Sequence, residues 1–430
     1  MMRASRDLHV HDMTAPAPAP APTRRHFLAT GGIALGTVGA LASATRVRAA
    51  DAGTGSAPPA LPASSAAAAP VPPIDTARFP PHGPLAAIRA RPDRLIDIAV
   101  CTRPFRAQGP RMEVERAHGK VLVHNYGHGG SGWSLSWGCA RHVRPWVLAT
   151  GERQAAVVGC GAIGLTTARV LQRAGLRVTI YAKDRPPEVR SSAATGLWTP
   201  DSRLITEANA TPDYADMWER ITRDSFKVYQ SLLGLPEHPV EWHDGYVLSD
   251  VPFEQSLPGE EDEPDYAELE AARTRDLRPR SEPLAAGQHP FKAAYVRRYT
   301  QMMFNIPAYA RMLMDDFLRE GGHLVQREFT HPRQFAGLPE RVIVNATGYG
   351  ARALLGDESI VPVRGQTARL IPQPEVDYGV IHRGHNLVVV PRRDGLLVAS
   401  NGPHDFGNAD ATPDRAQSEA AVLRLAALFA

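Results

Sequence analysis

Glycines at positions 159, 161 and 164 have the spacing Gly-x-Gly-x-x-Gly, which can bind the phosphates of a dinucleotide. The apolar run 154–158 predicts a buried strand before them, and 162–174 and 175–181 predict a helix and a second strand. In this setting the glycines permit a tight turn, and the helix N-terminus offers free N–H groups to a pyrophosphate. The alternative is a glycine-rich turn without a ligand. The strand–turn–helix–strand context favours a dinucleotide site at Gly159, Gly161, Ala162, Ile163 and Gly164.

Arg103 follows a strand-like run at 94–100. Its planar guanidinium can hold a carboxylate through two parallel hydrogen bonds, although an ion pair at the surface or between domains is the alternative. His124 and His128 stand just before a glycine-rich segment. Because the sequence has no His/Cys/Asp cluster at ligand spacing, we interpret both as structural histidines and expect no metal.

Further elements must position these residues. The segments 121–123 and 341–348 predict buried strands, and 133–147 predicts a helix. An amphipathic stretch near 214–233 and a helix at 306–320 are expected in the middle of the chain. Residues 360–400 alternate as strands, and 415–429 predict a closing helix.

Four blocks of the sequence carry a resemblance to a known family. They are LVHNYGHGGSGWSLSWGCA at 122–140, VVGCGAIGL at 157–165, ATGLWTP at 194–200 and VIVNATG at 342–348. Together they resemble the D-amino acid oxidase family over most of residues 95–430. The resemblance implies a mixed α/β fold, with a Rossmann-like domain that binds FAD non-covalently and a substrate domain on a largely antiparallel sheet.

The order of these blocks differs from that of the family. In the family the glycine fingerprint opens the chain and the His-Asn-Tyr-Gly segment nearly closes it, whereas here residues 124–132 precede residues 159–164. Joining residue 430 to about residue 90 would restore the family's order, and the short link 149–153 would be the new connection. We therefore expect a circularly permuted chain, which is tolerated where termini lie close together at a surface.

This order predicts a domain organisation in six segments. They are a signal peptide (1–50), an Ala/Pro-rich linker (51–80), two parts of the FAD-binding domain (94–202 and 319–358) and two parts of the substrate domain (203–318 and 359–430).

The resemblance also implies roles for individual residues. Arg103 corresponds to the arginine that binds the substrate carboxylate, and Gly130 lies beside the same substrate. The residues expected to contact FAD outside the fingerprint are Gly129, Gly130, Gly132, Trp133, Ser134, Ser191, Gly196, Leu197, Thr347 and Gly348. Trp198 is expected on the flavin face as well, although a core position is the alternative for Leu197 and Trp198.

Two positions depart from the family's pattern. Lys183 stands where the family has an acidic residue that binds ribose, so either Asp184 takes over that contact or the adenosine end of FAD is held differently. The family's two lid tyrosines correspond to positions near Gly384 and Val388, and His385 is a candidate replacement for the missing contact to the substrate carboxylate.

Composition limits the class of protein. With 43% hydrophobic and 22% charged residues and a net charge of +3, the chain suits a globular protein and gives no support for nucleic-acid binding. The segment 23–28, with Arg24 and Arg25, resembles a twin-arginine export signal, and Met13 could be the true start. The following mildly apolar run, 27–44, favours cleavage over a membrane anchor. Export to the periplasm or out of the cell is expected.

These observations predict an FAD-dependent enzyme that oxidises a D-amino acid or a similar small amine-bearing carboxylate. Oxygen is the expected electron acceptor, and the oligomeric state is open. Two alternatives remain at this stage. One is a dehydrogenase that passes electrons to a quinone or redox partner, and the other is a flavin- or ligand-binding protein without turnover.

Overall fold

The computed structural model describes residues 85–255, 257, 262–279, 281–400, 402 and 404–429. The expected signal peptide and most of the linker lie outside these residues, and both stay predictions. Apart from Glu254 and Gln255, the described residues belong to one compact unit. Within them, no helix is both long and apolar enough to cross a membrane.

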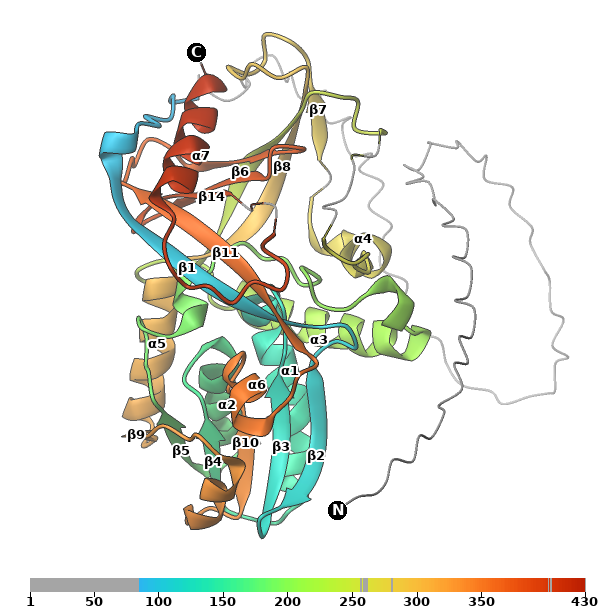
Figure 1. Cartoon of the computed structure of the whole chain (residues 1–430), viewed down its shortest axis with the longest axis vertical. Helices are drawn as coiled ribbons and strands as arrows, with labels where there is room; N and C mark the ends of the chain where they lie inside the picture. Colours follow the sequence, from blue (N-terminus) through green and yellow to red (C-terminus); the bar gives the residue numbers. More distant parts are fainter. Residues whose placement is uncertain are drawn as a thin grey trace, which may run out of the picture. The chain divides into compact units, whose positions relative to one another are not determined.

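The described residues form two sheets. The smaller has six strands in the order β2-β3-β10-β4-β5-β9, and β2 alone runs antiparallel to its neighbour. The strands are β2 (Arg111–Ala117), β3 (Lys120–Tyr126), β10 (Val342–Asn345), β4 (Gln154–Val158), β5 (Arg177–Ala182) and β9 (His323–Gln326). This sheet lies in the lower half of Figure 1.

Both faces of the six-stranded sheet are covered. Along β4, Ala155 and Val157 join a core with helices on one face, whereas Ala156 and Val158 join a second core on the other. Burial on both faces explains why β4 reads as a continuous apolar run instead of an alternating one. The N–H groups at the start of α2 (Ala162–Arg173) therefore follow a strand that is buried from Ala155 to Val158.

The larger sheet has eight strands among the described residues, in the order β1-β11-β14-β13-β12-β6-β8-β7. All neighbours are antiparallel except β12 and β6. The strands are β1 (Leu95–Arg106), β11 (Ile360–Leu370), β14 (Gly395–Ser400), β13 (Leu387–Arg392), β12 (Tyr378–His382), β6 (Val240–Ser249), β8 (Tyr295–Phe304) and β7 (Glu282–Leu284).

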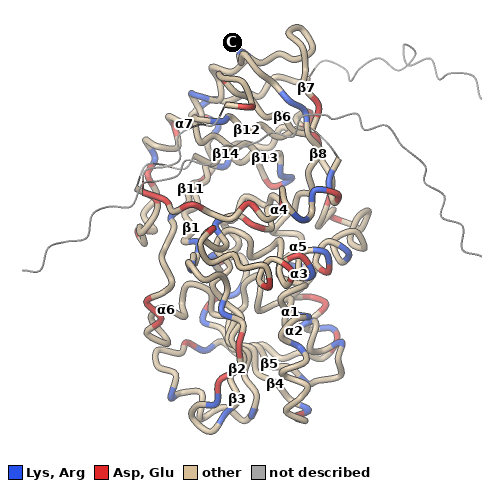
Figure 2. The backbone as a smooth tube through the Cα atoms, turned by 90° about the vertical axis from the view of Figure 1, so that its right-hand side faces the viewer, with Lys and Arg blue, Asp and Glu red and all other residues tan. Residues whose placement is uncertain are grey.

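Helices and short 3₁₀ turns connect the strands. The α-helices are α1 (Gly132–Leu148), α2, α3 (Pro212–Gln230), α4 (Leu269–Arg273), α5 (Ile306–Arg319), α6 (Gly350–Leu355) and α7 (Arg415–Ala427). The 3₁₀ turns are η2 (Pro92–Arg94), η3 (Arg190–Ala193), η4 (Glu207–Asn209), η5 (Arg275–Leu277) and η6 (Pro332–Gly337). Basic and acidic residues are interspersed along the described part of the backbone (Figure 2).

The last helix lies against the first described residues. In Figure 1, α7 lies beside the start of β1, and Cα atoms of α7 and η2 come within 8 Å of one another. Ile88 and Ala90 share a buried apolar cluster with Val422, Leu425 and Leu428. The expected proximity of residue 430 to residue 90 cannot be read directly, because residue 430 lies outside the described residues.

Most of the expected elements are present, and the mixed α/β fold is confirmed. The predicted strand at 94–100 is longer than expected, because β1 continues to Arg106 beside β11. One domain boundary needs correction: β1 lies in the eight-stranded sheet, although residues 94–202 were assigned to the FAD-binding domain. The other boundaries stay predictions.

Candidate active site

A cavity of about 1150 Å³ extends from the glycine fingerprint to the eight-stranded sheet. It exceeds the roughly 300–1,000 Å³ of ordinary small-molecule pockets, so it has room for a large cofactor together with a small substrate. Its walls come from the ends of β4, β5 and β10, from the loop after β3, and from β1 and its neighbours.

Most of the predicted site residues line this cavity. They are Arg103, Gly129, Gly130, Gly132, Trp133, Gly159, Gly161, Ala162, Ile163, Asp184, Ser191, Leu197, Thr347 and Gly348. Four predicted residues are not among its lining residues: Ser134, Gly164, Gly196 and His385. Trp198 is fully buried in the core and does not line the cavity either.

The fingerprint glycines form the tight turn that the sequence predicts. Gly159 has φ +112°, and a Cβ there would lie 2.4 Å from the carbonyl oxygen of Ala346. A Cβ on Gly164 would lie 2.0 Å from the carbonyl oxygen of Gly159, so this glycine allows close packing of helix on strand without lining the cavity. The backbone N–H of Ala162 donates to Ser191 Oγ at 3.1 Å, at the helix N-terminus where a pyrophosphate would bind.

The glycines after β3 lie close to the backbone of residues 202–203. Gly129 has φ +52°, and a Cβ there would lie 1.8 Å from the carbonyl oxygen of Arg203. The N–H of Gly130 donates to the carbonyl of Ser202 at 2.9 Å. Any larger residue at Gly129 would push the loop 202–203 away and change the wall of the cavity.

Ser134 and Gly196 shape the site without lining it. Ser134 Oγ accepts a hydrogen bond from the N–H of Thr199 at 2.8 Å, which fixes the segment after Leu197. Gly196 has φ +92°, and its Cβ would lie 2.5 Å from the carbonyl oxygen of Phe304. Both residues therefore support the position of Leu197 in the cavity wall.

The two histidines of this region differ. His124 Nε2 lies 3.0 Å from a Glu115 oxygen and its Nδ1 lies 3.3 Å from Asn345 Nδ2, which confirms a structural role. His128 lines the cavity, and its buried Nε2 has no hydrogen-bond partner among the described residues. Burial lowers the pKa of His128 to about 3, so its ring is neutral at pH 7. The interpretation of His128 as a satisfied structural histidine is wrong for Nε2, which is buried without a hydrogen-bond partner among the described residues.

Three charged side chains lie at the other end of the cavity, after β5 and β9. Asp184, Lys183 and Glu328 all line it, and Lys183 Nζ lies 3.5 Å from Glu328 Oε1. The ribose contact of Asp184 stays a prediction. Glu328 is a second carboxylate at this end of the cavity, and no motif in the sequence marks it.

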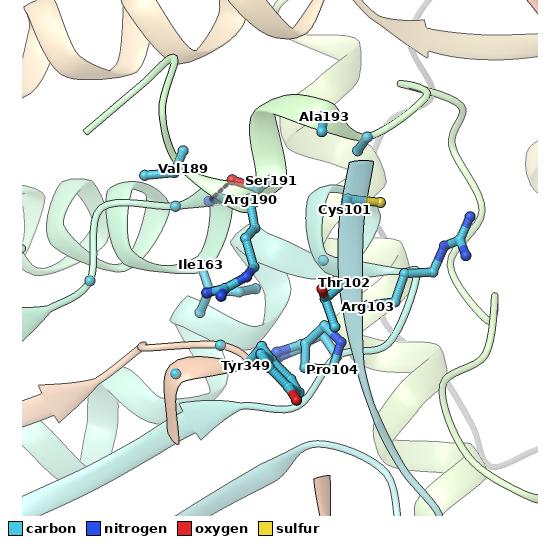
Figure 3. Close-up of a pocket in the computed structure, with 18 of the residues that line it drawn as sticks. Cys101, Thr102, Arg103, Pro104, Ile163, Val189, Arg190, Ser191, Ala193 and Tyr349 are labelled. Atoms are coloured by element: carbon cyan, nitrogen blue, oxygen red, sulfur yellow. Dashed lines mark hydrogen bonds between the residues drawn. The ribbon is translucent and has the colours of Figure 1, made fainter. Parts of the chain in front are cut away.

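Arg103 lies on the opposite side of β1 from Thr102, Arg190 and Tyr349 (Figure 3). Its Nη1 donates to the carbonyl of Arg364 at 2.7 Å. The guanidinium lies against Gly365, where a Cβ would be 2.5 Å from Nη2. Burial lowers the pKa of Arg103, because a buried cation loses hydration. A carboxylate that entered the cavity would compensate for that loss.

A second guanidinium, that of Arg203, lines the same cavity. It donates to Glu263 Oε1 at 2.8 Å and influences the pKa of Arg103 through its charge. Sequence reasoning missed Arg203. Its φ of +47° and the small residue at Gly129 that faces its carbonyl are visible only in the folded chain.

The expected lid positions carry no aromatic side chain. Gly384 has φ +78° in the turn between β12 and β13, while Ile381 and Val388, on either side of this turn, line the cavity. His385 was expected to contact the substrate, but its Nε2 lies 2.9 Å from Asp250 Oδ2 outside the cavity lining. That prediction is therefore wrong for the observed geometry.

An open, largely parallel sheet, a Gly-x-Gly-x-x-Gly turn at a helix N-terminus and a large cavity indicate a dinucleotide-binding protein. The family model described as "FAD dependent oxidoreductase" (DAO) matches residues 154–430, and the chain belongs to this family. FAD is its cofactor. The fingerprint, the close approach at Gly129 and the unpartnered His128 Nε2 fit that group.

Two D-amino-acid oxidases agree with this assignment. A D-amino-acid oxidase of Rubrobacter xylanophilus is 31% identical over 277 residues, which are 64% of this chain and 77% of that protein. A D-amino-acid oxidase of Dictyostelium discoideum is 27% identical over 63% of this chain and 71% of its own length. A solved L-amino acid deaminase from Proteus vulgaris is 13% identical over 65% of this chain and 75% of its own, with a TM-score of 0.42.

Proposed function

We propose that this flavoprotein oxidises a D-amino acid, or a similar small amine-bearing carboxylate, to the imino acid. The fingerprint turn with Gly159 and Gly161 would hold the pyrophosphate of FAD, and the bound flavin would supply the acceptor for a hydride from the substrate Cα. The amine loses a proton, and water hydrolyses the imine to a 2-oxo acid and ammonia. With oxygen as the acceptor of the two electrons, hydrogen peroxide is the second product. The names of the relatives support the substrate class.

The position of Arg103 is the single observation that carries this proposal. Its half-buried guanidinium is fixed by the carbonyl of Arg364 and lies beside Gly365 in the wall of the cofactor cavity. A planar guanidinium can bind a carboxylate through two hydrogen bonds, which orients the substrate as well as holding it. For hydride transfer, orientation of the Cα–H bond is what the protein must supply.

The remaining wall of the cavity suits the rest of such a substrate. Leu197, Ile381 and Val388 line it with apolar side chains. These residues favour an uncharged side chain near the reacting carbon and reduce the water there. Arg203, the other guanidinium of this wall, is paired with Glu263 at 2.8 Å.

The proposal is tested by a panel of D- and L-amino acids with the purified yellow protein, with oxygen consumption and peroxide followed together. Peroxide formed at the rate of D-amino acid consumption supports an oxidase. Reduction of an artificial acceptor without oxygen uptake would indicate a dehydrogenase instead. Absence of any reaction with the whole panel would contradict both and leave a binding protein without turnover.

We also propose that the chain is a circular permutant of the family's usual order. The family model begins at residue 154, yet β3 and β1, which precede that residue, pair with β10 and β11 in the two sheets. The proximity of α7 to η2 supports the same reading, because the family's connection would run between them. The five-residue link from α1 to β4 would then be the novel connection.

Export remains a proposal that rests on the sequence. Twin-arginine transport carries folded proteins, which suits an enzyme that must bind FAD before it leaves the cytoplasm. The segment with Arg24 and Arg25 supports this route to the periplasm or the medium.

A further inference from the structure

The edge of the eight-stranded sheet brings three potential metal ligands together. Strands β6 and β12 are parallel, with His382 opposite Leu248 in the register. Because parallel strands end at the same edge, Asp250, which follows β6, meets His382 at the end of β12. The turn 383–386 then places the His385 ring next to that of His382, with centroids 4.2 Å apart at 85°.

The donor atoms of the three side chains all lie within 4.8 Å of one another. His385 Nε2 is 2.9 Å from Asp250 Oδ2, and His382 Nε2 is 3.6 Å from Asp250 Oδ1. Tetrahedral coordination with bonds of about 2.0–2.2 Å separates ligand atoms by about 3.3–3.6 Å. The two distances at Asp250, 2.9 and 3.6 Å, lie just below this range and at its upper end, so only small side-chain movements would complete such a site.

The hydrogen bond of His382 Nδ1 determines the tautomer of the ring and leaves Nε2 unprotonated. Its Nδ1 lies 2.9 Å from the carbonyl oxygen of Arg383, and because a carbonyl only accepts, Nδ1 carries the proton. In the neutral ring, Nε2 then presents a lone pair towards Asp250. The separation of 3.6 Å is too long for a hydrogen bond, as expected for two acceptors that face each other. An imidazole held through Nδ1 by a carbonyl is the usual arrangement of a metal-binding histidine.

We propose that Asp250, His382 and His385 bind one divalent transition-metal ion of the Zn²⁺ type, with a position left for water. Two imidazole nitrogens and one carboxylate suit Zn²⁺, Ni²⁺ or Cu²⁺ better than the all-oxygen coordination of Mg²⁺ or Ca²⁺. His382 is buried, whereas 59% of the Asp250 side chain and 47% of the His385 side chain are exposed, so an ion can enter from solvent.

Such an ion would restrain the turn 383–386, which lies next to the cavity wall. The turn 383–386 connects Ile381 and Val388, both of which line the cofactor cavity. Coordination would tie this turn to the end of β6 and hold the apolar wall in place. The sequence suggested no metal, because the carboxylate lies 132 residues before His382 and only the strand pairing brings them together.

The test uses the full-length, FAD-loaded protein without a polyhistidine tag, titrated with Zn²⁺ by calorimetry and with Co²⁺ by visible absorption. One Zn²⁺ per chain and a rise in Tm on Zn²⁺ addition are expected. His385→Asn and Asp250→Asn change exposed side chains and should weaken Zn²⁺ binding more than the roughly 10–100-fold that loss of an outer hydrogen bond causes.

His404→Asn is the matched control, because His404 forms an exposed pair with Asp262 at 2.7 Å and belongs to no such three-ligand group within the described residues. It should bind Zn²⁺ as the wild type does. Failure of the wild type to bind one Zn²⁺ would overturn the proposal. Equal binding by His385→Asn and the wild type would overturn it as well, since the ion would then lie elsewhere.

Discussion

Gly365 is expected to control catalysis through the position of Arg103. It lies on β11 opposite Cys101, and a Cβ at this position would be 2.5 Å from Nη2, 2.7 Å from Cζ and 2.8 Å from Nη1 of Arg103. An ordinary contact begins near 3.4 Å, so Gly365→Ala must displace the guanidinium by about 0.9 Å. A displacement of about 1 Å at a positioning group can lower a rate about 100-fold, which corresponds to about 2.7 kcal/mol.

Gly365→Ala should therefore retain FAD, which the fingerprint holds, and lose about two orders of magnitude in kcat/KM. The assay is steady-state oxidation of the best D-amino acid from the panel, together with the flavin absorption spectrum. Gly337→Ala is the matched control, because Gly337 has open space around its Cβ position and no positive φ. It should keep wild-type kinetics.

A double-mutant cycle distinguishes displacement of Arg103 from direct obstruction of the substrate. In the Arg103→Ala background the guanidinium is absent, so Gly365→Ala should add little further loss. A wild-type kcat/KM in Gly365→Ala would show that Gly365 does not control the position of Arg103. A full, additive loss in the Arg103→Ala background would contradict that control too, because the methyl group would then act on the substrate itself.

Four other outcomes are expected. Arg103→Ala should keep FAD and lose about 2–5 kcal/mol of productive substrate binding, which corresponds to a thirtyfold to several-thousandfold fall in kcat/KM. Arg103→Lys should restore only part of this loss. Normal turnover by Arg103→Ala would mean that the substrate carboxylate binds elsewhere. The double variant Arg24→Lys/Arg25→Lys should stay in the cytoplasm, as cell fractionation would show, and unchanged export would exclude this signal. A chain rearranged to begin near residue 153 and to join its former C-terminus to residue 88 should fold, bind FAD and turn over; an insoluble product would count against permutation. The low pKa of His128 means that the unfolded chain binds more protons than the folded one between about pH 6.5 and 3, so stability falls on acidification by about 2 kcal/mol at pH 5. His128→Gln should reduce the drop in Tm between pH 7 and pH 5, and an identical drop would contradict this origin.

The cofactor half of the site could be predicted from the sequence because its signals are local. The fingerprint at 159–164 predicts its own turn, strand and helix, and the structure has β4, α2 and β5 within two residues of the expected limits. The glycines at 129 and 130 were likewise recognisable from the motif around them. In these places the chemistry depends on neighbours in the chain.

The substrate half depends on pairings between distant residues, and the sequence predicted it less well. Gly365 contacts Arg103 only because β1 lies beside β11. The same pairing brings Arg103 to the carbonyl of Arg364, which is 261 positions away in the sequence. Arg203 enters the cavity through a loop without a motif. His385 was assigned to the substrate from its place in the chain, but the turn at Gly384 directs it towards Asp250.

His124 and His128 show that contacts with distant strands are hard to predict even for two residues of one motif. His124 and His128 are four residues apart and were interpreted alike. The first finds partners on β2 and β10, whereas the second is buried against the cavity with Nε2 unpartnered among the described residues. Which histidine is satisfied depends on strands that the motif does not contain, and β2 was not predicted at all.

Binding of a D-amino acid at Arg103 and its oxidation with FAD can be tested by anaerobic rapid mixing of the purified protein with single amino acids. At least one D-amino acid should bleach the flavin absorption within the turnover time, and its L-enantiomer should do so far more slowly. Arg103→Ala should bleach slowly with its FAD still bound. Flavin that stays oxidised with every amino acid tested, or an Arg103→Ala variant that is reduced as fast as the wild type, would contradict this proposal.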